Sequence, residues 1–184
     1  SPILDALIAP QEPKTTPDGT MGWVVDVLNP VTGDDFVLML KELQMPDGTT
    51  RPYSVWAAGK YPKALDGLLK VLSLDMRVVD VEWIGMKLRK LAKYSEPQGD
   101  FMARIPGEEK MMTYPSTEAY IASLMMHRYT MLGILDKNGY SPDKKGNQSE
   151  DVKKGLISVE PGLGVTGEAC PECGNHSVIK KDGC

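Results

Sequence analysis

Apolar and polar residues alternate along three segments in the first third of the chain, a pattern that predicts half-buried β-strands. The segments are residues 23–28, 36–43 and 51–57. Turn-forming residues separate them, Asn-Pro-Val-Thr-Gly-Asp at 29–34 and Pro-Asp-Gly at 46–48. Because both connections are short, we expect the three strands to form an antiparallel meander.

The hydrophobic period changes from two to about 3.6 near Lys60, which predicts that helices follow the strands. Leucines at helical spacing define a first helix, and Asp80 is the expected N-cap of a second. The expected apolar faces are Leu65, Leu68, Leu69 and Leu72 on the first helix, and Trp83, Ile84, Leu88 and Leu91 on the second.

Pro115 and Ser116 open the clearest helix, with Ser116 as N-cap and Glu118 in the first turn. Gly139 is expected to end it, and residues 94–115, rich in Gly and Pro, are expected to be irregular. The core face of this helix should be Ile121, Leu124, Met125, Leu132 and Leu135. The core as a whole should include Leu68, Leu72, Ile84, Leu88, Ile121, Leu124 and Leu132.

The sequence therefore predicts an α+β fold, an antiparallel three-stranded sheet packed with helices. A flexible linker and a partial zinc-ribbon-like tail are expected to follow it. The expected division is an extended lead-in at 1–20, the α+β domain at 21–140, the linker at 141–166 and the cysteine tail at 167–184.

Composition narrows the class of protein. The chain of 184 residues is 41% hydrophobic and 25% charged, which is typical of a globular protein. A net charge of -4 argues against duplex nucleic acid as the main partner, because phosphate binding needs a basic surface. No apolar run is long enough to span a bilayer, and no signal-peptide pattern opens the chain, so we expect no membrane partner and a cytoplasmic location.

All three cysteines lie in the last fifteen residues, where Cys170-Pro171-Glu172-Cys173-Gly174 forms a C-x-x-C knuckle and Cys184 follows. Two thiolates at this spacing can bind one face of a zinc ion, or can form a redox pair that closes a disulfide. His176 could add a metal ligand, although a polar residue on the strand leaving the knuckle is the plainer interpretation. The residues alone leave structural zinc and redox chemistry open.

Other candidates have plainer explanations. His127 lies in the middle of the last predicted helix and is expected to be a packed or surface residue. The basic residues at 87–93 are expected to form a solvated helix face, with an acidic partner as the alternative. Motifs for a nucleophilic serine, a phosphate-binding loop, a dinucleotide or a zinc protease are missing from the sequence.

The tail resembles a known family. Residues 166–184, which read Thr-Gly-Glu-Ala-Cys-Pro-Glu-Cys-Gly at their start and Asp-Gly-Cys at their end, are similar to the C-terminal tail of adenosylcobalamin-dependent (class II) ribonucleotide reductases. A second, weaker resemblance covers parts of the predicted α+β domain. Residues 51–56 (Arg-Pro-Tyr-Ser-Val-Trp), Gly59-Lys60 and 72–74 (Leu-Ser-Leu) resemble the small α+β domain before that tail, and residues 83–135 resemble a form in which this region is a separate small chain.

The resemblance implies an accessory component or C-terminal domain of a ribonucleoside-diphosphate reductase. The catalytic chain or domain, which binds adenosylcobalamin, would be a partner, and a thioredoxin-type protein could be the reductant. Cys170, Cys173 and Cys184 would then serve thiol exchange or bind zinc, and no residue here would belong to the radical site. This chain alone is expected to be inactive, because every cysteine belongs to the tail.

One departure from the family pattern limits what the resemblance implies. In the family a second C-x-x-C pair follows, whereas this sequence stops at Cys184, so three cysteines are not expected to close a four-cysteine zinc site within one copy. The alternative function is a non-catalytic zinc-ribbon module that docks protein or single-stranded nucleic acid.

Overall fold

The computed structural model describes residues 17–45, 47–97 and 99–142. The chain divides into two units between Lys145 and Gly146, and every described residue belongs to the first. The elements of this unit, in chain order, are β1 (Met21–Asn29), β2 (Asp34–Gln44), β3 (Thr50–Lys60), α2 (Ala64–Met76), α3 (Val81–Leu91), β4 (Phe101–Ala103), β5 (Met112–Tyr114) and α4 (Thr117–Met131).

The three predicted strands form the expected antiparallel meander, in the order β1-β2-β3. Side-chain chemistry shapes both turns. The Asn29 side-chain oxygen accepts hydrogen bonds from the backbone N–H groups of Val31 (3.0 Å) and Thr32 (3.4 Å), and Asp47 accepts from the N–H of Thr49 (2.9 Å). Asparagine and aspartate favour turns for this reason.

The three predicted helices are present, and both predicted N-caps are confirmed. The Asp80 carboxylate accepts from the N–H of Glu82 (3.0 Å), and the Ser116 hydroxyl accepts from the N–H of Ala119 (3.0 Å). The predicted end of the last helix at Gly139 is wrong. Helix α4 ends at Met131, and Gly133, with φ of 74°, follows the C-cap Leu132. The N–H of Ile134 then bonds to the carbonyl of Tyr129 (3.0 Å), a common helix-ending arrangement that needs a positive φ.

The prediction that residues 94–115 are irregular needs a partial correction. Strands β4 and β5 pair there in antiparallel register, with Phe101 opposite Tyr114. Both aromatic rings pack against Tyr120 of α4, at centroid distances of 5.8 Å and 4.7 Å. Aromatic packing of this kind anchors the small hairpin to the helix.

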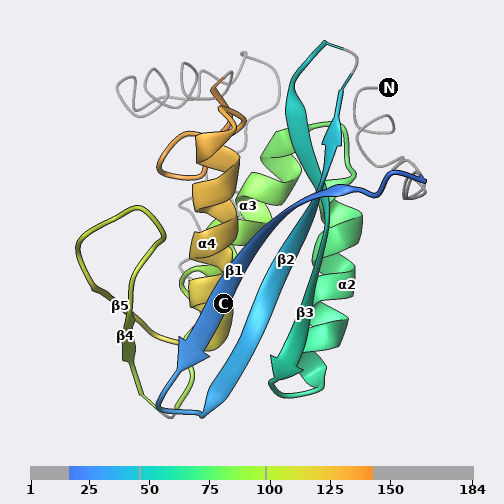
Figure 1. Ribbon diagram of the computed structural model, residues 1–184. Helices are drawn as coiled ribbons and strands as arrows, with labels where there is room; N and C mark the ends of the chain where they lie inside the picture. The colour runs from blue at the N-terminus through green and yellow to red at the C-terminus, as the bar shows by residue number, and fades with distance from the viewer. Residues whose placement is uncertain (1–16, 46, 98, 143–184) are drawn as a thin grey trace, which may run out of the picture. The chain divides into compact units, whose positions relative to one another are not determined.

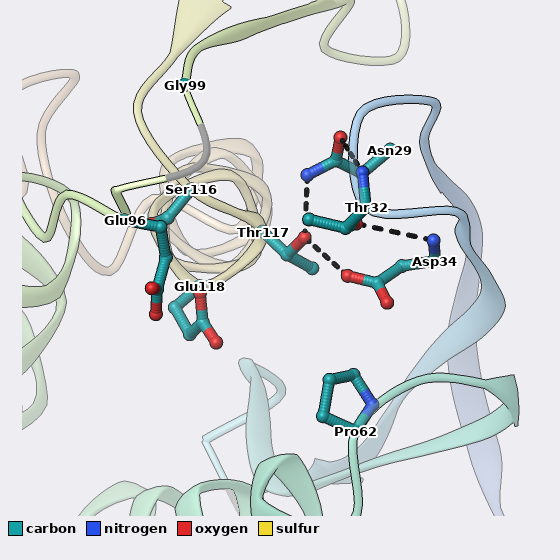
Figure 2. A pocket seen from close by; sticks show the side chains of 9 residues that line it. All are labelled: Asn29, Thr32, Asp34, Pro62, Glu96, Gly99, Ser116, Thr117 and Glu118. Carbon is teal, nitrogen blue, oxygen red and sulfur yellow. Dashed lines mark hydrogen bonds between the residues drawn. The ribbon is translucent and has the colours of Figure 1, made fainter.

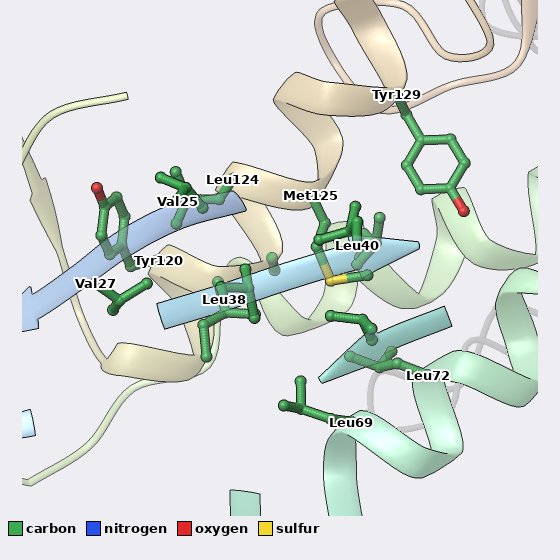
Figure 3. Close-up of a cluster of buried hydrophobic side chains, with 14 of the residues drawn as sticks. Val25, Val27, Leu38, Leu40, Leu69, Leu72, Tyr120, Leu124, Met125 and Tyr129 are labelled. Carbon is green, nitrogen blue, oxygen red and sulfur yellow. The ribbon is translucent and has the colours of Figure 1, made fainter. Parts of the chain in front are cut away.

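Helices α2, α3 and α4 lie on one side of the three-stranded sheet (Figure 1), and the core fills the space between them. Figure 3 shows Leu38 and Leu40 of β2 between Leu124 and Met125 of α4 and the leucines of α2. Of the predicted core residues, Leu72, Ile84, Leu88, Ile121 and Leu124 are buried. Leu68 and Leu132 are only half-buried.

Helix α2 also covers the outer edge of β3. The Ser73 hydroxyl accepts from the N–H of Val55 (3.0 Å) and lies 3.1 Å from the carbonyl oxygen of the same residue. One side chain thus contacts both backbone groups that Val55 turns away from the sheet.

The chain after α4 packs back onto α3. The Arg89 guanidinium donates to the carbonyl of Gly139 (2.6 Å), and the N–H of the buried Ser141 donates to the Glu82 carboxylate (3.1 Å). Gly85 allows this approach, because a Cβ there would lie 2.7 Å from the Gly139 carbonyl. Within the described residues, none of the helices has the length and apolar character needed to cross a membrane.

Candidate functional site

The residues that the sequence singles out for chemistry lie beyond the described part of the chain. Cys170, Cys173, Cys184 and His176 all fall in the range 143–184, so the structure does not test zinc binding or thiol exchange there. In the described ranges, no group of three or more His, Cys, Asp or Glu side chains could hold a metal ion.

Two of the body segments with the family-like sequence, 51–56 and 72–74, contact each other. Arg51 at the start of β3 donates to the carbonyls of Met76 (3.0 Å), Val78 and Val79 (3.1 Å), where α2 ends. Ser73 bonds to Val55 as described above. These segments therefore hold β3 against α2, and Trp56 and Leu74 are the large apolar side chains among them that stay exposed.

A polar hollow of about 270 Å³ lies where the β1–β2 turn meets the first turn of α4 (Figure 2). Helix α4 begins there because Ser116 caps it. Thr117 and Glu118, the next two residues, line the hollow. The lining residues are Asn29, Thr32, Asp34, Pro62, Glu96, Gly99, Ser116, Thr117 and Glu118.

Three buried side chains form a hydrogen-bonded chain along one wall of this hollow. The Asn29 amide donates to the Thr117 hydroxyl (2.9 Å), and that hydroxyl donates to the Asp34 carboxylate (2.8 Å). The direction follows from the groups themselves, since an ionised carboxylate can only accept and the amide NH₂ can only donate. The network joins the β1–β2 turn to α4 across more than eighty positions of sequence.

The hollow is acidic. Burial raises the pKa of the Glu118 carboxyl, and the nearby carboxylates of Glu96 and Asp34 raise it further, against the opposing hydrogen bonds from its own backbone N–H and from Ser116. Such a hollow suits a group that brings hydrogen-bond donors or positive charge, and it disfavours phosphate. No histidine or cysteine lines it, and its acidic side chains are those of Asp34, Glu96 and Glu118.

Substituting Glu118 by glutamine should raise the melting temperature at neutral pH. A carboxyl whose pKa is higher in the folded state than in the unfolded state binds more protons when folded, so stability falls as pH rises through its titration. Glutamine keeps the shape without the charge. The gain measured by thermal unfolding at pH 7 should disappear below about pH 4, where the carboxyl is protonated in both states. A gain that is the same at both pH values would contradict this assignment.

Sequence reasoning missed a second charged feature, the ion pair between Glu42 of β2 and Arg128 of α4. The Arg128 guanidinium binds both carboxylate oxygens, with Nε 2.6 Å from Oε1 and Nη2 2.9 Å from Oε2. A signal was present, because Glu42 continues the inward alternation of Leu38 and Leu40, and Arg128 continues the helical spacing of Ile121 and Leu124.

His127 and two basic residues of α3, Lys87 and Arg89, pack against neighbouring side chains, whereas Lys90 is exposed as predicted for a solvated face. The His127 ring lies 6.5 Å from that of Trp23, as expected of a packed histidine. Arg89 pairs with Glu82 (2.6 Å), and the Lys87 ammonium lies 5.0 Å from the centre of the Trp83 ring.

Comparison with known proteins does not place the chain in a family. No family model, curated protein or solved structure matches it. A function must therefore be argued from the residues of the chain itself.

Proposed function

We propose that this chain is an accessory component of an adenosylcobalamin-dependent ribonucleoside-diphosphate reductase, acting beside a catalytic chain or domain that lies outside the sequence. The observation that carries the proposal is the tail sequence Cys170-Pro171-Glu172-Cys173-Gly174 together with Asp182-Gly183-Cys184. The body supports it, because two of the segments that resemble the family's small domain pack against each other as one structural unit.

In this function the tail delivers reducing equivalents. Each turnover of the catalytic partner oxidises a pair of its cysteines to a disulfide while the ribose 2′-hydroxyl leaves as water. A thiolate of the Cys170–Cys173 pair attacks one sulfur of that disulfide and forms a mixed disulfide, and the second tail thiolate then displaces the partner's cysteine. The partner's pair ends reduced and the tail pair ends as a disulfide, which a thioredoxin-type protein reduces in turn.

The thiol pair is covalently attached to the α+β body, which would stay bound to the catalytic partner. This attachment would make the thiol exchange efficient. A tethered thiol pair has an effective concentration on the order of millimolar, above that of a freely diffusing protein reductant. Lys180 and Lys181 follow the knuckle in sequence, and nearby positive charge favours the reactive thiolate form.

Zinc fits the same donor set. Three cysteines and His176 would supply the number and types of ligand that a structural zinc ion takes, and zinc binding is the alternative to thiol exchange as the role of these cysteines. Adenosylcobalamin would be bound by the catalytic partner, and no step requires it on this chain.

A reconstitution assay tests the proposal. The chain incubated with adenosylcobalamin, a ribonucleoside diphosphate and a dithiol should form no deoxyribonucleotide. Adding the chain to a cobalamin-dependent reductase of the same organism should raise its turnover with a protein reductant. The proposal fails if the chain turns over alone, or if it leaves the reductase unchanged and instead binds single-stranded nucleic acid or another protein as a zinc-containing module.

A further inference from the structure

The polar hollow at the start of α4 has no part in the proposed reductase function, and its charge indicates what it could bind. Its three acidic side chains come from three segments. Asp34 opens β2, Glu96 lies in the connection between α3 and β4, and Glu118 is in the first turn of α4. Among the residues that the structure describes, none of the three has an ion-pair partner. The hollow therefore holds negative charge that this part of the chain does not neutralise.

Asp34 is the residue of the hollow that points to a ligand. This residue is 7% exposed, and one of its carboxylate oxygens, Oδ2, accepts from the Thr117 hydroxyl (2.8 Å). The other oxygen, Oδ1, has no hydrogen-bond partner within the described ranges, and the carboxylate points into the hollow between Thr117 and Pro62 (Figure 2). A charged oxygen in so buried a residue is costly unless a donor reaches it. A donor that enters the hollow therefore finds an oriented acceptor in its wall.

We propose that the hollow binds a primary ammonium group carried on an alkyl chain. Asp34 Oδ1 accepts one of its N–H groups, and the longer side chains of Glu96 and Glu118 rotate to accept the others. An ammonium fits better than a guanidinium, because Thr117 leaves Asp34 one free oxygen whereas the guanidinium fork needs two. It also fits better than a metal ion, since no group of three or more such side chains in the described ranges could hold one. Pro62, which lines the same hollow, offers an apolar surface to the alkyl chain.

The balance of charge decides whether a cation is stable here, because the positive end of the α4 dipole faces the same hollow. That dipole contributes about half of an elementary charge at the first turn of the helix. Three carboxyl groups outweigh it, even when one of them is protonated. The pKa of Glu118 has the sign of this excess, since burial raises it and the nearby carboxylates of Glu96 and Asp34 raise it further. A bound ammonium offsets the repulsion among the three groups.

Hydrogen bonds hold two of the acceptors in place before a ligand arrives. Asn29 donates to Thr117 and Thr117 donates to Asp34, which fixes the aspartate between the β1–β2 turn and α4. The Tyr94 hydroxyl donates to the Glu96 carboxylate (2.9 Å). Acceptors that are already oriented reduce the entropy lost on binding. The inference uses neither the tail cysteines nor the proposed reductase function.

Nuclear magnetic resonance of the full, isotope-labelled chain tests the proposal, with n-butylammonium as the probe. The backbone amide signals of Asp34, Gly99 and Thr117 should shift and saturate with a Kd on the order of millimolar, the range expected of so small a ligand. Tetramethylammonium at the same ionic strength has the charge but no N–H group, so it should cause no saturable shift. N-acetyl-lysinamide distinguishes the sources of the ammonium. Tighter binding than that of butylammonium indicates a lysine of a partner protein, and weaker binding indicates a free amine.

Variants show whether the probe binds in the hollow. Glu96→Gln and Glu118→Gln each remove one charge and should weaken butylammonium binding at least about threefold, and Asp34→Asn should weaken it at least about tenfold. Glu109→Gln, an equal change at an exposed position between β4 and β5, should leave the binding unchanged. A circular dichroism melt shows whether Asp34→Asn is folded, and the two glutamate variants decide the question if it is not. The proposal is overturned if no saturable shift occurs, if tetramethylammonium binds equally well, or if both glutamate variants bind the probe as tightly as the wild type.

Discussion

Replacing Arg128 with methionine should lower the free energy of unfolding by about 3–5 kcal/mol, because it leaves a buried carboxylate without its partner. The Glu42 side chain is 4% exposed and receives both of its short ion-pair contacts from Arg128. Water cannot replace the guanidinium at so buried a site without opening the contact between β2 and α4. Urea unfolding followed by far-ultraviolet circular dichroism measures the loss.

The companion double variant separates the lost partner from lost packing. Glu42→Met with Arg128→Met removes both charges and keeps apolar stems of similar length, so it should recover most of the stability lost by Arg128→Met alone. Lys70→Met, an exposed change on α2, should alter stability by less than about 0.5 kcal/mol. If the double variant is less stable than the single one, packing of the two stems rather than the unpaired charge dominates, and our explanation is wrong.

Changing Cys170 and Cys173 together to serine should reduce turnover of the reconstituted reductase with a thioredoxin-type reductant on the order of 100-fold. The reason is that a tethered thiol pair at millimolar effective concentration is lost. Turnover with a small dithiol that enters the catalytic site directly should be retained. The body should stay folded, because its core is built from residues that include no cysteine.

Metal analysis of the same proteins decides between the two roles of the tail. If the cysteines bind zinc, the wild-type chain should carry about one zinc ion and the double variant none. Ser177→Ala, a substitution in the same tail that replaces no cysteine, is the matched control for both measurements. Equal turnover with both reductants, with no metal in either protein, would leave the knuckle without a role.

The strands, the helices and their N-caps could be predicted because their signals are local. Asp80 and Ser116 each bond to a backbone N–H within three residues, so neighbouring sequence is enough to place them. The end of α4 was harder to predict, because Leu132 and Leu135 continue the apolar spacing past Gly133. Leu135 is indeed buried, but it reaches the core from the segment after the helix rather than from the helix itself.

The remaining features depend on residues that are far apart in sequence. Strands β4 and β5 have three residues each, too few for a period to show, and they are held by aromatic contacts with α4. The hollow at the start of α4 combines turn residues of β1 and β2 with Thr117. The sequence predicts Asn29 and Asp34 only as turn-forming residues. The fold shows that both also hydrogen-bond to Thr117 at the start of α4.

Ser73 has a consequence for how the sheet could grow. A sheet extends sideways when an incoming strand finds unpaired N–H and C=O groups along an edge. On β3 the Ser73 hydroxyl contacts both such groups of Val55, and α2 lies along the strand that carries them. An amyloid-like or domain-swapped strand therefore has no template at this position, so the serine protects the chain against irreversible self-assembly through the β3 edge.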